Sequence, residues 1–214
     1  MIIEEKTCIE AWKKSLNYII EKGIDFVDLD RRQCREVLNL IVTITEPEKD
    51  NEKLIDAMKK FEWIYPSCEE LSAVMFNRED SAIYEYSYGP RIFNFFGKKD
   101  QVNDFIIPLL KNDKNSRRAI ISLFNPSTDS ETLNKNIPSL MLIHFKIVEN
   151  KLNCTCVIRS NDCFIGWPGN IYQIYLLQKY VSEKIGIDTG TISTVSCSAH
   201  VFHEHFENIK DIKY

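Results

Sequence analysis

Apolar residues recur along the chain with two different periods, which indicate helices and strands. Between Cys8 and Lys22 the apolar side chains fall at i, i+4, i+7 and i+8, the spacing of one helix face, and Gly23 ends the pattern. Residues 37–45 read VLNLIVTIT, a β-branched run that stops before a proline and is typical of a strand. The N-terminal part is therefore expected to contain both kinds of element.

The same criteria predict the elements of the remaining chain. Further helices are expected over 51–61, 68–76, 100–110 and 170–185. Further strands are expected over 119–124, 140–148, 152–158 and 191–198, with a turn at Glu149-Asn150. No repeat and no Gly-, Ser- or Pro-rich linker divides the sequence. We therefore expect one α+β domain over residues 1–214, with helices packed on a mixed β-sheet.

Composition narrows the class of protein. The 214 residues are 44% hydrophobic and 27% charged, which excludes disordered, collagen-like and coiled-coil chains. A net charge of −4 argues against a protein built to bind nucleic acid through the phosphate backbone.

Three features bear on where the protein works. No apolar run approaches the roughly 20 residues that a membrane span needs. The first residues, MIIEEK, lack the basic-then-apolar order of a signal peptide. The seven cysteines are irregularly spaced, which predicts free thiols in a reducing cytosol. We expect a cytoplasmic protein without a membrane or nucleic-acid partner.

Two polar clusters flank predicted strands. In Asn115-Ser116-Arg117-Arg118 the paired guanidinium groups could clamp a phosphate or a carboxylate, although an isolated arginine pair is more often a solvated turn. Residues 159–162 read RSND and are followed by GWPGN at 166–170, where a loop could present polar groups to a phosphorylated heterocycle. Alternatively, Asp162 only caps the following helix.

The histidine and cysteine patterns give only a weak indication of a metal site. The segment 200–205 (HVFHEH) carries residue types that bind metals, but no further ligand set with helical i, i+4 spacing accompanies it. We therefore expect no metal site. Cys154 and Cys156 share one face of a predicted strand; because structural zinc needs four ligands, we interpret them as small core residues.

Taken in order, these segments resemble thymidylate synthases and the related pyrimidine nucleotide hydroxymethylases. The matching motifs are YGPR at 88–91, NSRR at 115–118, NP at 125–126, IPS at 137–139, KL at 151–152, RSND at 159–162, GWPGN at 166–170 and SAHVF at 198–202. Order and spacing are kept from about 84 to 206, and the short chain is closest in length to compact archaeal members. The resemblance implies a thymidylate-synthase-like fold and transfer of a one-carbon unit, methyl or hydroxymethyl, to C5 of a pyrimidine nucleotide. The implied donor is methylene-tetrahydrofolate or methylene-tetrahydromethanopterin.

The resemblance also implies how phosphate is bound. Arg117 and Arg118 match residues that reach across a homodimer interface to the nucleotide phosphate of the other subunit. Arg159 and Ser160 match residues that bind phosphate within their own subunit, and Arg159 also lies beside the nucleophile. A further N-terminal phosphate arginine has three candidates: Arg31, Arg32 and Arg35.

Other matched positions concern the base, the sugar and catalysis. Asn170 matches the amide that reads the pyrimidine edge, and asparagine there suits uracil. His200 and Phe202 match the histidine and tyrosine that hold the sugar hydroxyl, although Phe202 lacks the phenolic oxygen. Tyr88 and Asp162 match catalytic positions, Asp162 near the base and the one-carbon donor. The catalytic glutamate has two candidates: Glu69 and Glu70.

Ser139 stands where the family has a cysteine whose thiolate adds to C6 of the pyrimidine, so that C5 becomes nucleophilic. A serine hydroxyl does not ionise near neutrality without a dedicated base. His144 is expected to point away from Ser139 unless a bulge intervenes. Cys163 and Cys197 lie in matched segments, but not where the family has a nucleophile. Three explanations stay open: an engineered substitution, altered chemistry, or binding without turnover.

Two functions therefore compete. The first is a one-carbon transferase acting on C5 of a pyrimidine nucleotide, dUMP-type preferred, with Ser139 at the nucleophile position. The second is a catalytically silent nucleotide-binding or regulatory homologue. Ser139, Phe202 and the lack of the C-terminal segment that closes over folate in longer members all weaken thymidylate synthesis. A metal-dependent hydrolase built on the histidines of 200–205 ranks below both, and we favour the first.

Overall fold

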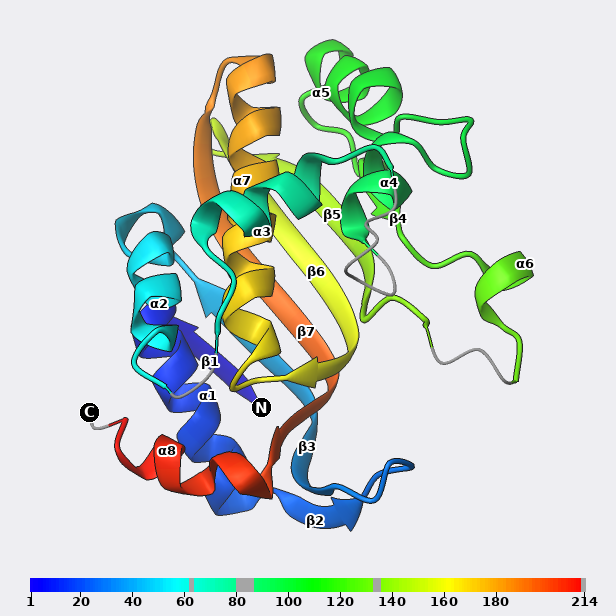
Figure 1. The fold of residues 1–214 in the computed structure, drawn as a ribbon. Helices are drawn as coiled ribbons and strands as arrows, with labels where there is room; N and C mark the ends of the chain where they lie inside the picture. Colours follow the sequence, from blue (N-terminus) through cyan, green and yellow to red (C-terminus); the bar gives the residue numbers. More distant parts are fainter. Residues whose placement is uncertain (62–63, 80–86, 133–135, 213–214) are drawn as a thin grey trace.

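The computed structural model describes residues 1–61, 64–79, 87–132 and 136–212, and within them seven strands form one mixed sheet (Figure 1). The strand order is β1-β3-β7-β6-β5-β4, and β2 pairs with β3. The strands are β1 (Ile2–Glu5), β2 (Ile24–Val27), β3 (Gln33–Ile44), β4 (Ile120–Ser122), β5 (Leu140–Val148), β6 (Lys151–Asp162) and β7 (Asp188–Phe202). The pairs β1–β3 and β6–β7 are parallel, and the other pairs are antiparallel.

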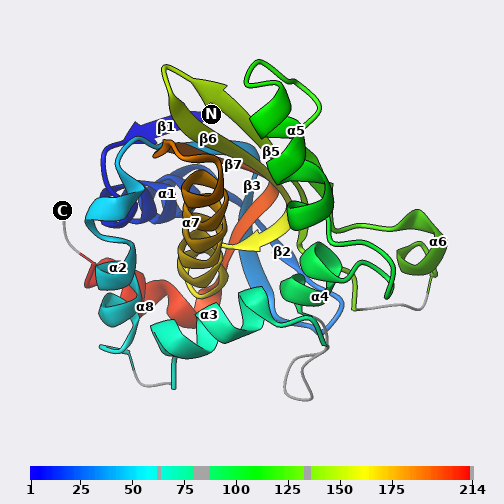
Figure 2. The ribbon, with the colours of Figure 1, turned by 90° about the horizontal axis from the view of Figure 1, so that it is seen from above.

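The larger helices gather on one side of this sheet (Figure 2). The α-helices of the described chain are α1 (Cys8–Lys22), α2 (Asn51–Met58), α3 (Cys68–Phe76), α4 (Tyr88–Phe93), α5 (Ile107–Asn112), α6 (Pro126–Asp129), α7 (Gly166–Ile185) and α8 (Phe206–Lys210). α1 packs on β3 and β1, and α7 packs on β6 and β7. Trp167 and Leu177 of α7 are fully buried between the sheet and the other helices. The predicted α+β class, a mixed sheet with packed helices, is confirmed.

Local sequence signals place several elements accurately: α1, α3 and β5 have the predicted bounds. α1 begins after Thr7, whose side chain accepts a hydrogen bond from the Glu10 amide, and it ends at Gly23. In the predicted turn, Glu149 and Asn150 have φ values of 49° and 59°, as a tight two-residue hairpin requires.

Two helix predictions are wrong in detail, and a proline explains each. α7 begins at Gly166, so the segment 166–170 is helical and not a loop. Pro168 is tolerated there because first-turn amides have no partner within the helix. The predicted helix around Pro108 starts with a π-helical turn, Val102–Ile106, and continues into α5. Since the proline ring crowds the preceding turn, the helix is wider there.

Other elements differ in length or escape the pattern. β3, β6 and β7 are longer than predicted, whereas β4 and α2 are shorter. β1, β2, α4, α6 and α8 are short elements that no periodicity predicts. β2 shows the reason, because all four of its residues are exposed and give no alternation.

The alternation of buried side chains changes phase at one level of the central strands. In β7 the buried positions pass from Ser196 to Ala199, and in β6 they pass from Ile158 to Asn161. An interval of three residues moves the buried set to the opposite parity. The residues that follow Asn161 and Ala199 therefore point away from these buried side chains and stay partly exposed.

The strands on either side are irregular at this level too. β5 shifts register between Leu140 and Leu142, and Asn39 in β3 has a φ of 55°. The extra residue in β5 puts Ser139 and His144 on the same side of the strand. The sequence analysis expects His144 to point away from Ser139 unless a bulge intervenes, and a bulge is present here. The two residues are still about 15 Å apart along the strand.

The second face of the sheet carries no helix in the described part of the chain. In β4, Ile121 is fully buried whereas its neighbour Ile120 is 44% exposed. In β6, Cys156 is buried while Thr155 and Val157 on the other side are not. Apolar side chains on this face are therefore partly exposed to solvent.

The state of the cysteines agrees with the sequence prediction. All seven cysteines are free thiols. Cys154 and Cys156 are buried on one face of β6 with their sulfur atoms 3.5 Å apart, and burial raises the pKa of Cys154. None of the described helices is long and apolar enough to cross a bilayer.

Candidate active site

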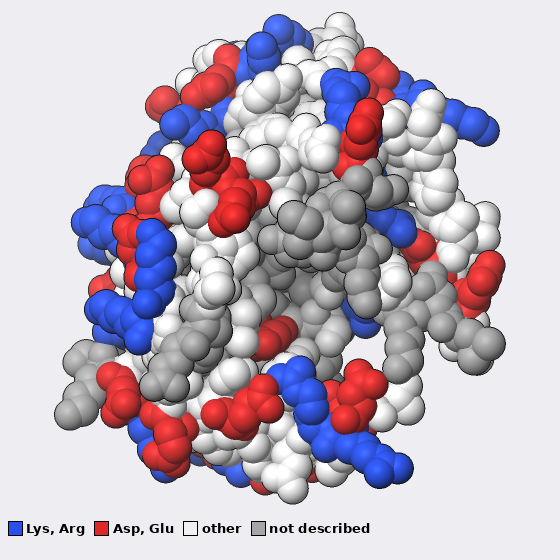
Figure 3. Space-filling view, in the orientation of Figure 1, with Lys and Arg blue, Asp and Glu red and all other residues white. Residues whose placement is uncertain are grey.

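Strand register brings several predicted site residues to one end of the sheet. β6 and β7 are parallel, so their C-terminal ends meet at the same edge, where Asp162 lies opposite His200 and Ser160 opposite Ser198. Residues opposite one another, and residues two apart on one strand, point to the same side of a sheet. Phe202, two residues after His200, therefore points to the same side as His200 and Asp162. Figure 3 shows a hollow near the middle of the face that Figure 1 presents, with acidic and basic side chains among the atoms around it.

Arg159 holds the segment that carries Ser139. Its guanidinium donates through Nη2 to the Ile137 carbonyl at 2.7 Å and through Nε to the Pro138 carbonyl at 3.2 Å. Its backbone N–H donates to the Ser139 carbonyl at 2.9 Å. The predicted neighbourhood of Arg159 and Ser139 is therefore present. Because a guanidinium has five N–H donors, Arg159 can hold this segment and still present donors to an anion.

Asp162 has a structural role that leaves part of its carboxylate open. Its Oδ1 accepts hydrogen bonds from the amides of Phe164 and Ile165, at 2.9 and 3.1 Å, and so fixes the turn before α7. No described residue donates to Oδ2. Asn170 is partly buried in the second turn of α7, and its side chain has no hydrogen bond to any described residue. Both side chains therefore have capacity for a polar ligand.

His200 lies between two carboxylates. Asp162 on β6 and Glu36 on β3 lie opposite it on its two sides. Burial lowers the pKa of His200, while the charges of Asp162 and Glu36 oppose this shift. Its Nδ1 is buried without a hydrogen-bond partner among the described residues. His200 is therefore mainly neutral at pH 7.

Phe202 is covered by an arginine. The central carbon of the Arg32 guanidinium is 3.3 Å from the centre of the Phe202 ring, and Arg32 Nη2 donates to Glu204 Oε1 at 2.6 Å. The Phe202 ring also meets the His200 ring edge to face, with centroids 5.2 Å apart. Of the three N-terminal arginine candidates, Arg32 is thus the one that contacts a predicted site residue.

Of the other N-terminal candidates, Arg35 is paired within the fold and Arg31 is exposed in a turn. Arg35 makes a two-pronged ion pair with Asp25, at 2.6 and 2.9 Å. Arg31 occupies a turn with a φ of 64°. Glu70 forms a capping box with Ser67 at the start of α3, where each side chain accepts the other residue's amide.

Arg117 and Arg118 lie far from this end of their own chain. Both are exposed and precede β4, next to Ala119, whose carbonyl accepts the amide of Phe145. Since β5 runs away from Ser139, that level lies about 15 to 20 Å along the strand from the nucleophile position. The structure does not bring this pair to the other predicted site residues.

Arg91, in the first matched motif, forms an ion pair that the sequence analysis did not predict. Arg91 donates to both Asp129 oxygens, at 2.7 and 2.9 Å, and to the Leu123 carbonyl at 2.7 Å. Burial raises the pKa of Asp129, but hydrogen bonds from Arg91 and the Asn125 amide outweigh it and hold this pKa below its usual value. Tyr88 begins α4 and is packed in the hydrophobic core.

The histidines of 200–205 do not converge on one point. His200 faces carboxylates on neighbouring strands, His203 Nε2 contacts Asp25 Oδ1 at 3.0 Å, and the His205 ring packs on Phe164. Within the described ranges, no group of three His, Cys, Asp or Glu side chains could hold a metal ion.

The buried cysteines near this end are poor nucleophiles. Burial raises the pKa of Cys163 and raises that of Cys34 to about 11. Neither thiol is therefore ionised at neutral pH.

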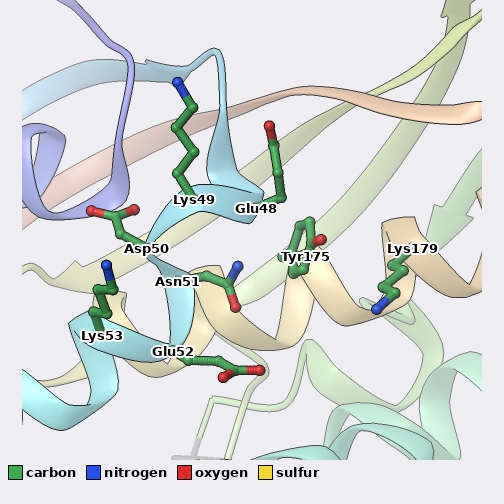
Figure 4. Close-up of a pocket in the computed structure, with 8 residues that line it drawn as sticks. All are labelled: Glu48, Lys49, Asp50, Asn51, Glu52, Lys53, Tyr175 and Lys179. Carbon is green, nitrogen blue, oxygen red and sulfur yellow. The ribbon is translucent and has the colours of Figure 1, made fainter.

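A surface pocket of about 260 Å³ lies elsewhere, between α2 and α7 (Figure 4). It is lined by Glu48, Lys49, Asp50, Asn51, Glu52, Lys53, Tyr175 and Lys179. Acidic and basic groups are mixed around it, and Asp50 caps α1 by accepting the amides of Cys8 and Ile9 at 2.8 and 3.0 Å. None of the predicted site residues lines this pocket.

Comparison with known proteins points to one family. The family model described as thymidylate synthase matches residues 8–212. The protein named "Putative thymidylate synthase" of Methanosarcina barkeri is 33% identical over 211 residues, 99% of this chain and 94% of its own length. Its namesake in Methanocaldococcus jannaschii is 27% identical over 217 residues, 98% of this chain and 95% of its own. The "Thymidylate synthase" of Listeria monocytogenes is 32% identical over 146 residues, 62% of this chain and 45% of its own.

Proposed function

The chain belongs to the thymidylate synthase family, and from this premise we propose that it acts on C5 of a pyrimidine nucleotide, dUMP-type preferred, with Ser139 in the place of the attacking thiol. Family membership supports a thymidylate synthase-type one-carbon transferase, methyl or hydroxymethyl. The observation that carries the finer proposal is the hydrogen-bonded contact of Arg159 with Ser139, at the same sheet end as Asp162 and His200.

The open polar groups at this end suit the parts of a nucleotide. Arg159 has donors left for a phosphate, and the Ser160 hydroxyl lies on the next residue of the same strand. The Asn170 amide can both donate and accept, as the edge of uracil requires. These groups support binding of a dUMP-type nucleotide whether or not the protein turns it over.

The chemistry of Ser139 determines whether the protein activates C5 slowly or not at all. Addition to C6 requires the serine oxygen to lose its proton, and a hydroxyl holds that proton far more tightly than a thiol does. His144, on the same side of β5, is about 15 Å away and too distant to act as the base. We therefore expect C5 activation to be far slower than in a cysteine variant. The competing function, a silent nucleotide-binding homologue, follows from the same observation.

We also propose that the active assembly is a homodimer. Arg117 and Arg118 are exposed and far from their own Ser139, so they can serve a phosphate only in another subunit. The helix-free sheet face, with Ile120 partly exposed, provides the surface for such a contact.

The family implies a folate-type one-carbon donor. We propose methylene-tetrahydrofolate as this donor, with methylene-tetrahydromethanopterin as the alternative. When bound, such a donor supplies the methylene carbon that C5 receives. The Oδ2 of Asp162 and the side-chain amide of Asn170, to which no described residue hydrogen-bonds, fit a polar pterin ring beside the base. The chain's own contribution is to orient the two rings through these groups.

Tritium release tests the proposal directly. Nucleotides labelled at C5 (dUMP, dCMP, UMP and CMP) are incubated with the unmodified protein and with Ser139→Cys, with and without each methylene donor. We expect release by Ser139→Cys to exceed that of the unmodified protein by orders of magnitude, with dUMP the preferred substrate. Equilibrium binding of the same nucleotides is measured in parallel.

The outcomes separate the competing functions. Release by the unmodified protein would show that C5 is activated without a thiol. If neither protein releases tritium but both still bind nucleotide, the binding homologue is favoured. If neither protein binds any of the four nucleotides, both functions are wrong.

A further inference from the structure

Glu36 is a polar residue at this end of the sheet that none of the matched motifs contains. β3 places it directly opposite His200, on the side away from Asp162, so that the three side chains form a cross-strand row. Opposite residues in such rows have their Cβ atoms about 5 Å apart. Ser198, two residues before His200 and on the same side, donates from Oγ to Glu36 Oε2 at 2.5 Å. This hydrogen bond orients the carboxylate beside the imidazole.

The row has unused hydrogen-bonding capacity. No described residue donates to Glu36 Oε1, and His200 Nδ1 is buried without a partner in the same part of the chain. Phe202, where the family has a tyrosine, offers only its ring, and the Arg32 guanidinium covers that ring. A carboxylate acceptor therefore stands beside His200, where the phenolic oxygen is missing.

We propose that Glu36 accepts a hydrogen bond from a sugar hydroxyl of the bound nucleotide and thereby selects nucleotides that carry this hydroxyl. The assignment rests on the proposed function, with the sugar of the nucleotide at His200, where the resemblance implies it. A hydrogen bond to an ionised acceptor is stronger than one between neutral groups. Arg32, stacked on Phe202, places a positive charge near the row and offsets the charge that Glu36 brings toward the phosphate.

The test compares ligands that differ only in their hydroxyl groups. Dissociation constants of UMP, dUMP and 2′,3′-dideoxy-UMP are measured for the unmodified protein, for Glu36→Gln and for the control Glu207→Gln, whose side chain is 83% exposed in α8. Removing a negative charge alters phosphate binding equally for all three ligands. The affinity ratio between hydroxyl-bearing and dideoxy ligands therefore isolates the hydrogen bond.

We expect the unmodified protein to prefer a hydroxyl-bearing ligand to the dideoxy ligand, and Glu36→Gln to reduce this preference about tenfold or more. An equal loss for UMP and dUMP identifies the 3′-hydroxyl, whereas a loss for UMP alone identifies the 2′-hydroxyl. Glu207→Gln is expected to leave the ratio unchanged. Ser198→Ala, which keeps the carboxylate but not the hydroxyl that orients it, is expected to reduce the ratio less.

Three results overturn the assignment. A ratio that stays the same in both Glu36→Gln and Ser198→Ala shows that no sugar hydroxyl is held by Glu36. A loss that is equal for all three ligands, the dideoxy ligand included, assigns Glu36 a purely structural or electrostatic role. If the unmodified protein binds none of the ligands, the proposed function fails first and the assignment of Glu36 fails with it.

Discussion

Two polar clusters of this protein use similar residues in opposite ways. Around Arg91 and Asp129, both carboxylate oxygens are paired with the guanidinium and the aspartate is 1% exposed. In the row of Glu36, His200 and Asp162, each side chain has an atom that no described residue satisfies. The first cluster is complete within the described chain, whereas the second leaves polar atoms open to a further partner there.

The difference shows how structural and ligand-binding polar residues can be told apart. Arg91 and Arg159 both lie in matched motifs, so the resemblance gives them equal weight. Arg91 is paired with a buried carboxylate, whereas the hydrogen bonds of the Arg159 guanidinium to described residues go to carbonyl groups, which leave its positive charge uncompensated. Contacts, and not motif membership, indicate which arginine stabilises the fold and which is available to an anion.

The largest expected effect is a loss of stability when the ion pair of Arg91 and Asp129 is broken. Arg91→Ala leaves the buried Asp129 without its cation and should lower the free energy of unfolding by about 3–5 kcal/mol. Urea denaturation at pH 7 measures the loss. The double variant Arg91→Ala, Asp129→Ala should recover part of it, because no unpaired charge remains. A loss below about 1 kcal/mol for Arg91→Ala would contradict the structural role.

The second prediction concerns the dimer. Replacing both Arg117 and Arg118 with alanine should weaken nucleotide binding by about 2–5 kcal/mol and leave stability unchanged, because both side chains are exposed. Titration of dUMP and urea denaturation measure the two quantities. Unchanged affinity would contradict the proposed inter-subunit site.

Subunit mixing supplies the control for that prediction. If the pair serves the partner subunit, a mixture of the double variant with Arg159→Ala should regain tight binding in about one quarter of the sites, because half of the random dimers contain one intact site. If the pair serves its own subunit, the mixture regains no intact site.

Local patterns were enough to predict α1, α3 and β5, because their periodicity and end signals lie within a few neighbouring residues. The same local signals failed at 166–170, where glycine and proline suggested a loop. Trp167 instead packs in the core, and Pro168 fits the first turn of α7.

The candidate site could be predicted only as far as the motifs reached. Glu36 lies in an ordinary strand sequence, and only the pairing of β3 with β7 places it beside His200. Likewise, the phase change in β6 and β7 depends on neighbouring strands and not on local propensity. Sequence separation therefore limits which side chains can be assigned to the site.

The third prediction separates the two clusters by pH. Burial lowers the pKa of His200 and of His205 from the ordinary value of 6.5. The unfolded chain then binds more protons, so the free energy of unfolding should fall as pH drops through about 6.5. Asp129 has a lowered pKa, so its contribution is kept down to about pH 4 and is lost at lower pH.

Urea denaturation at a series of pH values from 8 to 3 checks both windows. His200→Asn combined with His205→Asn should flatten the decline between pH 7 and 5, and Arg91→Ala should flatten the decline below pH 4. Declines that remain unchanged in these variants would assign the pH dependence to other groups.

The smallest expected effect is at the start of α3, where two glutamates are candidates for catalysis. Ser67→Ala removes one half of the capping box and should lower stability by about 1 kcal/mol without altering nucleotide binding. Glu70→Gln keeps an acceptor for the Ser67 amide, so stability and tritium release by the Ser139→Cys protein should both be preserved. Glu69→Gln, the neighbouring change outside the box, is the matched comparison. If either variant loses tritium release while its stability is unchanged, that glutamate is catalytic. The start of α3 would then belong to the ligand-binding part of the molecule and not to its structural part.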